Sequence, residues 1–159
     1  MPAGLSGQPR RERAHQYRGL VSDFFVAGSW RNRTAIVEVV QALDDAGASS
    51  YSFVRAEYDE SASDFARPGG ADDADLHEPG IQRLFDQDLA ALHDADQFVL
   101  VLPAGAAAHI EAGIAYGLGK RCWAVGPIDR SETLYRIFTA MTDDAASLVQ
   151  HLKRSRALQ

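Results

Sequence analysis

Residues 97 to 125 read QFVLVLPAGAAAHIEAGIAYGLGKRCWAV, and they carry the clearest structural pattern in the chain. Gln97 to Leu102 is nearly continuously apolar, which is typical of a central parallel strand covered on both faces. Pro103 to Ala108 is a loop of small residues that enters a helix running to Leu118, and Gly119 ends this helix. Cys122 to Val125 forms the next strand. The segment therefore predicts a strand, a crossover helix and a second parallel strand.

The N-terminal side repeats this alternation. Phe24 to Ala27 predicts a buried strand that ends in a turn at Gly28 and Ser29, and apolar residues at helical spacing follow up to Gly47. Tyr51 to Val54 forms a short second strand, and Pro79 begins a helix with an apolar stripe.

Beyond residue 125 we expect a short helix at residues 132–137, a weak strand at residues 138–141 and a last helix from Asp143 to about Lys153, capped by Thr142. Strands and helices thus alternate along the chain. This order predicts an α/β fold, a three-layer sandwich with a mostly parallel, flavodoxin/Rossmann-like sheet of about five strands.

The length of 159 residues and the hydrophobic content of 46% suit a single domain. We divide the chain into a flexible basic N-terminal tail at residues 1–19 and one α/β domain at residues 20–156. Residues 57 to 78 hold eight acids and one base around Pro68, Gly69 and Gly70. We expect this acidic segment to lie outside the sheet as a mobile flap over a cleft, the alternative being a disordered loop without a role.

The net charge of −6 at pH 7 argues against a nucleic-acid partner. A single cysteine, Cys122, excludes an internal disulfide and a cysteine cluster for a metal, so we expect no metal and a cytoplasmic location. The longest apolar stretch, Phe98 to Ile114, contains Pro103 and Glu111 and does not suit a membrane span. We therefore expect no membrane partner.

Three segments are expected to meet beyond the carboxyl ends of the strands, where open α/β sheets bind ligands. The first runs from Gly28 through Ser29 and Trp30 to Asn32, where Gly28 allows close approach and the Trp30 indole offers a face to a planar ring. Alternatively, Trp30 only covers the edge of the sheet. A dinucleotide fingerprint is rejected because its other glycines are missing.

The second segment runs from Pro103 to Glu111. Its small residues, Gly105 among them, leave room for a ligand, and the free amides of the helix start suit an anion. Glu111 is the main catalytic candidate, although a glutamate near a helix start is also an ordinary surface residue. His109 lies on another side of the helix, at the rim of the site.

The third segment holds Asp88, with Asp86 half a turn earlier. Single aspartates of this kind are commonly solvated surface charges. Two carboxylates near one cleft, however, can divide nucleophilic and proton-transfer roles at a glycosidic carbon. Asp94 and Asp96 are expected to serve the helix end and the strand entrance.

Four motifs then stand in order over roughly residues 24 to 125: Phe25-Val26-Ala27-Gly28-Ser29-Trp30, Leu84-Phe85-Asp86-Gln87-Asp88-Leu89, Asp96 before an apolar strand, and Glu111-Ala112-Gly113-Ile114-Ala115-Tyr116-Gly117-Leu118-Gly119-Lys120. This series resembles the nucleoside 2-deoxyribosyltransferase superfamily. It is also similar to an uncharacterised bacterial branch with a Ser-Trp-Arg-Asn turn and a Pro-x-Gly-x-x-Ala-His-x-Glu segment.

The resemblance implies that Glu111 attacks the anomeric carbon of a ribose or deoxyribose, that Asp88 assists sugar and base, and that the Gly28 turn lies beside the base. Two positions depart from the family pattern. Phe25 stands where the family usually has a tyrosine that orients the nucleophile. Gly105 stands where the transferases have a sugar-binding aspartate and related nucleotide hydrolases a serine.

The resulting prediction is an N-glycosidic-bond enzyme, a nucleoside deoxyribosyltransferase-like transferase or an N-glycoside hydrolase, that uses a glutamate nucleophile and no cofactor. Its substrate would be a nucleoside, a nucleotide or, since the fold type also resembles NAD-cleaving Toll/interleukin-receptor domains, an NAD-like riboside. The alternative is a non-catalytic nucleotide-binding or sensing module that retains the cleft. Because the family usually completes its pocket with a neighbouring chain, we expect a homo-dimer or larger assembly, packed through the helix of Gly113, Ala115, Tyr116 and Gly117.

Overall fold

The computed structural model of the chain describes residues 22–130, 132–155 and 157–158. The basic tail expected at residues 1–19 lies outside the described residues. Five strands form one parallel sheet in the spatial order β2-β1-β3-β4-β5. Their bounds are Phe24–Ala27 for β1, Ser50–Tyr51 for β2, Gln97–Val101 for β3, Arg121–Val125 for β4 and Phe138–Thr142 for β5.

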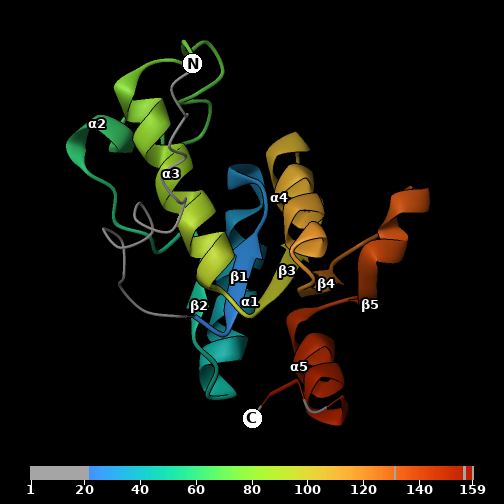
Figure 1. Ribbon diagram of the computed structural model, residues 1–159. Helices are drawn as coiled ribbons and strands as arrows, with labels where there is room; N and C mark the ends of the chain where they lie inside the picture. The colour runs from blue at the N-terminus through green and yellow to red at the C-terminus, as the bar shows by residue number, and fades with distance from the viewer. Residues whose placement is uncertain (1–21, 131, 156, 159) are drawn as a thin grey trace, which may run out of the picture.

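Helices cover both faces of this sheet (Figure 1). On one face lie α1 (Arg33–Asp45) and α5 (Ala145–Arg154), and on the other α3 (Pro79–Asp94) and α4 (Ala106–Gly117). Three short helices complete the described elements, η2 (Trp30–Asn32), α2 (Glu60–Ser63) and η3 (Thr133–Ile137). The predicted three-layer α/β sandwich with a parallel, flavodoxin-like sheet is confirmed.

The strands are apolar on both faces because each face has its own helical layer. In β1, Phe24 and Val26 belong to the core beneath α1 and α5, whereas Phe25 and Ala27 belong to the core beneath α3 and α4. All four residues are buried. This is the pattern expected of an interior parallel strand, and it explains why hydrophobic runs rather than alternation marked the strands in the sequence.

Some predicted boundaries were wrong. Strand β2 ends at Tyr51, not at Val54. The last helix is capped by Asp144, not by Thr142, because the Asp144 carboxylate accepts the backbone N–H of Ser147 at 2.7 Å. Thr142 instead ends β5.

Residues 57–78 form no strand, as predicted, but they contain the single-turn helix α2, which the sequence pattern did not indicate. Asp59 caps α2 by accepting the backbone N–H of Ala62 at 3.0 Å. A Cβ on Gly80 would collide with the carbonyl oxygen of Ser61, so α2 and α3 pack closely. That the segment closes over a ligand stays a prediction.

The strand order places the topological switch point of the sheet between β1 and β3. From β1 the chain passes through α1 to β2 on one side, and from β3 it passes through α4 to β4 on the other side. The connections therefore diverge at the carboxyl ends of β1 and β3, the usual ligand position in such sheets. In the described part of the chain, no helix combines the length and apolarity required to cross a membrane.

Candidate active site

Two carboxylates, Asp88 on α3 and Glu111 on α4, lie close to each other over the same face of the sheet. Both side chains are partly buried. Their proximity is expressed in the electrostatics, because the charge of Asp88 raises the pKa of Glu111. The charges of both carboxylates also raise the pKa of Tyr58. The helices predicted to carry the catalytic candidates thus bring them together.

Asp88 is held by two phenols. The hydroxyls of Tyr51 and Tyr58 both donate to Oδ1 of Asp88, at 2.7 and 3.1 Å. Tyr51 is the last residue of β2, so these bonds place Asp88 at the carboxyl end of the sheet. Burial raises the pKa of Asp88, and the two hydrogen bonds oppose that rise because they favour the ionised form.

Glu111 lacks such support. Within residues 22–130, 132–155 and 157–158, no hydrogen bond reaches its carboxyl group. Burial, and then the charge of Asp88, raises the pKa of Glu111 to about 8. Of the two carboxyl groups, Glu111 therefore holds a proton more readily at neutral pH.

Aromatic rings line the sheet beside these carboxylates. The ring of Tyr51 stacks on that of Phe25 with centroids 5.4 Å apart, and Phe25 stacks on Phe98 at 5.9 Å. Phe25 is only 3% exposed. This apolar layer keeps water from the hydroxyl of Tyr51 on one side, and burial accordingly raises the pKa of Tyr51.

The turn after β1 is built for packing. A Cβ on Gly28 would lie 2.7 Å from Cδ1 of Ile36 and 3.2 Å from the carbonyl oxygen of Val101, so glycine is needed for contact between the strands and α1. The Ser29 hydroxyl accepts the backbone N–H of Arg31 at 3.2 Å and so caps η2.

The Trp30 ring contacts Phe53, with centroids 4.5 Å apart, and Phe53 packs against the core beneath α1. This contact is the one expected of a ring that covers the sheet edge. Asn32 links the segment after β1 to the loop after β3, since its Nδ2 donates to the carbonyl oxygens of Leu102 at 3.0 Å and Pro103 at 3.4 Å.

The start of α4 leaves an open space beside a fixed histidine. Gly105 is the N-cap, and a Cβ there would meet nothing within 4 Å. Nδ1 of His109 is 2.8 Å from the Gly105 carbonyl oxygen, and Nε2 is 3.0 Å from the hydroxyl of Tyr135. Because a carbonyl only accepts, Nδ1 carries a hydrogen and donates it to the Gly105 oxygen. His109 thus joins α4 to η3.

Asp86 does not join the pair. It is exposed and accepts a hydrogen bond from Nε2 of Gln82 at 3.0 Å. Among the described residues, moreover, no group of three or more histidine, cysteine, aspartate or glutamate side chains is arranged to hold a metal ion.

Comparison with known proteins adds one structural neighbour. No protein-family model and no curated protein sequence matches the chain. The solved structure of the Clostridium botulinum CMP N-glycosidase BcmB superimposes with a TM-score of 0.52 at 15% sequence identity, covering 82% of this chain and 97% of that chain. The two chains share a fold. At this level of identity the likeness concerns the fold alone.

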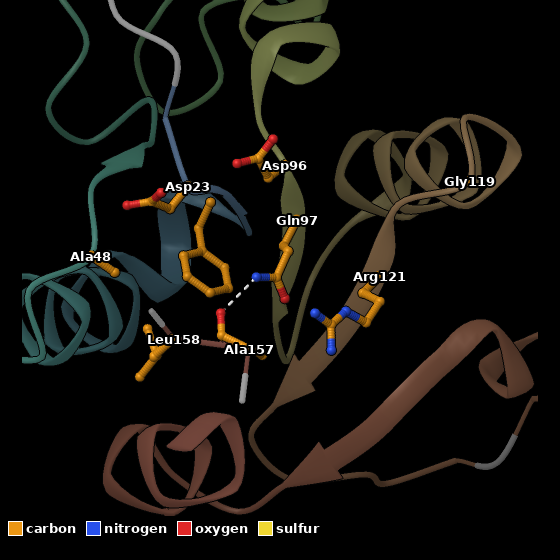
Figure 2. Close-up of a pocket in the computed structure, with 9 residues that line it drawn as sticks. Asp23, Ala48, Asp96, Gln97, Gly119, Arg121, Ala157 and Leu158 are labelled. Atoms are coloured by element: carbon orange, nitrogen blue, oxygen red, sulfur yellow. Dashed lines mark hydrogen bonds between the residues drawn. The ribbon is translucent and has the colours of Figure 1, made fainter. Parts of the chain in front are cut away.

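A hollow lies at the other end of the sheet, where the strands begin (Figure 2). It has a volume of about 400 Å³ and is lined by polar groups that include Asp23, Asp96 and Arg121. The Gln97 side chain in this hollow donates to the Ala157 carbonyl oxygen at 2.9 Å and accepts from the indole N–H of Trp123 at 2.9 Å. Gln97 therefore ties the C-terminal segment to the sheet, on the edge away from Asp88 and Glu111.

Sequence reasoning missed two residues of the site, Tyr51 and Tyr58. The predicted strand began at Tyr51, whereas β2 ends there, so the sequence placed Tyr51 at the wrong end of the strand. Tyr58 had no signal, since it stands in an acidic segment without periodicity. Asn32 belongs to the predicted segment that starts at Gly28, but its bond to a loop 70 residues away leaves no trace in the sequence.

Proposed function

We propose that this chain is an N-glycosidic-bond enzyme that acts on a nucleoside, a nucleotide or an NAD-like riboside. The observation that carries the proposal is the pair of partly buried carboxylates, Asp88 on α3 and Glu111 on α4, near the switch point of the sheet. The fold shared with a CMP N-glycosidase supports a nucleotide as substrate. We assign Glu111 as nucleophile and Asp88 as the second carboxylate.

The proposed reaction has two steps. A carboxylate oxygen of Glu111 attacks C1′ of the sugar while the C1′–N bond breaks. The electron pair of the broken bond goes to the nitrogen of the departing base, and this nitrogen takes up a proton. The sugar is then joined to Glu111 as an ester. Water attacks C1′, loses a proton and frees the carboxylate, giving the free sugar. A second base in place of water gives transfer.

The environment of the two carboxyl groups suits different roles. Glu111 must lose its proton to attack, and its low solvation makes the carboxylate a stronger nucleophile once ionised. Asp88 is held by two phenols in an orientation suited to a substrate hydroxyl or base. In this proposal Gly28, Ser29 and Trp30 lie beside the base, and Gly105 and His109 border the sugar side.

Two observations favour the alternative, a non-catalytic nucleotide-binding or sensing module. The Phe25 ring is buried in an aromatic stack and offers no hydroxyl, and Gly105 presents open space where a side chain would contact a sugar. Such a module would bind the same ligands without base release.

Base release from a panel of nucleosides, nucleotides and NAD tests the proposal. We predict that Glu111→Gln lowers base release by roughly a thousandfold or more, because the amide cannot act as nucleophile. The melting temperature should stay within a few degrees, since the side chain makes no hydrogen bond to the described part of the fold. Chromatography of released base and thermal unfolding provide the two measurements.

Glu38→Gln is the matched control, because Glu38 is an exposed glutamate on α1. Normal turnover by Glu111→Gln would refute the nucleophile assignment. Thermal stabilisation by a nucleotide, without base release from any compound in the panel, would identify the binding module instead.

A further inference from the structure

We propose that Tyr51 and Tyr58 are positioning residues that fix Asp88 for the reaction, and that Tyr58 links the acidic segment at residues 57–78 to that carboxylate. The inference rests on the proposed function and extends it to two residues outside the carboxylate pair. Its evidence is the geometry of the hydrogen bonds around Asp88.

Both phenols approach the same oxygen of Asp88. Tyr51 and Tyr58 donate to Oδ1 at 2.7 and 3.1 Å, and they come from β2 and from the acidic segment, 37 and 30 residues away from Asp88. Among the described residues, Oδ2 receives no hydrogen bond. Two donors on one oxygen fix the carboxylate plane and leave the other oxygen for a ligand.

Tyr51 is itself held rigidly. Its ring stacks on the buried ring of Phe25, and Nε2 of Gln87 lies 3.5 Å from its hydroxyl oxygen. Because Gln87 directly precedes Asp88 on α3, the same helix contributes the supporting amide and the carboxylate. A hydroxyl fixed in this way needs little ordering when substrate binds.

Tyr58 is held by contacts between its neighbours and α3. The Glu57 carbonyl oxygen accepts from Nε2 of Gln87 at 2.9 Å, and Arg83, one turn earlier on the helix, donates to the hydroxyl of Ser61. These bonds dock residues 57–61 along one face of α3. The position of the acidic segment is thereby coupled to the hydrogen bonding of Asp88.

The arrangement predicts a signature that a purely structural role would not give. The titratable groups acting on Asp88 and Glu111 are these two carboxyls and the phenols of Tyr51 and Tyr58. Loss of a phenol hydroxyl removes a bond to ionised Asp88, so the pKa of Asp88 rises. Replacing Asp88 itself by a neutral residue removes the charge that, after burial, raises the pKa of Glu111.

The test is a carbon-13 NMR titration of the side-chain carboxyls in the ligand-free full chain. Tyr51→Phe and Tyr58→Phe keep the rings and remove the hydroxyls. We expect each to raise the pKa of Asp88 by about one unit, the order of one hydrogen bond to a charged group. Asp88→Asn should lower the pKa of Glu111, because it removes the charge of Asp88.

Glu38→Gln, at an exposed glutamate of α1, is the control and should leave both pKa values unchanged. An unchanged titration of Asp88 in both phenylalanine variants would overturn the positioning role. A raised pKa of Asp88 in these variants, found in a chain whose wild type releases no base, would support the positioning geometry and refute only the proposed function.

Discussion

At the scale of single residues, Glu111 shows how burial without a hydrogen-bond partner among the described residues raises the pKa of a carboxyl group. The ordinary pKa of this side chain is 4.5, and burial followed by the charge of Asp88 raises it to about 8. Asp88 is also buried, but two phenols stabilise its charge. The carboxyl groups of Asp88 and Glu111 thus differ in how readily they hold a proton, because their hydrogen-bond partners differ.

This difference predicts a pH-dependent cost to stability. The folded pKa of Glu111 lies above its unfolded value, so the charged form destabilises the fold as pH rises from about 4.5 to about 8. Glu111→Gln lacks this titration. The free energy of unfolding of Glu111→Gln, relative to that of the wild type, should therefore increase between pH 5 and pH 8 by on the order of 1 kcal/mol or more.

Urea unfolding at pH 5, 6.5 and 8 measures this difference. Glu38→Gln, at an exposed site, should run parallel to the wild type. Parallel curves for Glu111→Gln as well would mean that the carboxyl group is solvated and that its pKa is near the ordinary value.

At the residue level, the sequence predicted which helices carry Asp88 and Glu111, and their catalytic roles stay a prediction. Asp88 and Glu111 stand on predicted helices that flank the central strand, so topology alone brings them to one region. Tyr51 and Tyr58 reach Asp88 across 37 and 30 positions of chain. No periodicity encodes such a contact, because it depends on how far β2 and the acidic segment extend over α3.

At the scale of elements, helix ends and turns were less predictable than helix and strand cores. The α5 cap was assigned to Thr142, but strand β5 continues through that residue, and Asp144 is the first side chain able to reach the free amides. Both residue types are good caps, so composition did not distinguish them. The length of the preceding strand made the difference.

The turn at Gly28 supports a prediction at this scale. Gly28→Ala should destabilise the fold by about 1–3 kcal/mol, because the new Cβ would overlap Cδ1 of Ile36 and crowd the Val101 carbonyl oxygen. Ile36→Val removes that Cδ1. Chemical unfolding of the two single variants and the double variant should show that Gly28→Ala costs less in the Ile36→Val background, a non-additive pair.

Gly113→Ala is the matched control at protein concentrations at which the chain is monomeric, because a Cβ at Gly113 on α4 would meet nothing within 4 Å of the same chain. Alanine in a helix should then be neutral or stabilising, by up to about 1 kcal/mol. An undiminished loss for Gly28→Ala in the Ile36→Val background would show that contact with Ile36 does not set the requirement for glycine at position 28.

At the scale of the whole molecule, the alternation of strands and helices was sufficient to predict the layers and the parallel sheet. No single segment of the sequence predicts the strand order β2-β1-β3-β4-β5. It follows from the right-handed crossovers and from the two separate cores, which require helices on both faces. The family resemblance predicted the same fold type, and the CMP N-glycosidase superposition agrees with it.

The expected homo-oligomer concerns the outer face of α4. Ala115, which we had placed in the contact, is fully buried against the sheet. The residues that α4 does expose include Ile110 at 63% and Tyr116 at 55%, with Phe85 on neighbouring α3 at 55%. Gly113 and Gly117, also exposed, would let a second helix approach closely.

We therefore predict that the wild-type chain sediments as a dimer or larger closed assembly at micromolar concentration, and that Ile110→Glu shifts it toward monomer. A carboxylate at position 110 would be buried without a partner in an interface through α4, at a cost of several kcal/mol per ion. Leu134→Glu is the control, since Leu134 is 76% exposed on η3 and lies outside the α4 face. A purely monomeric wild type would refute the assembly. A dimer that persists in Ile110→Glu would place the contact on another face, and elements other than α4 would then form the interface.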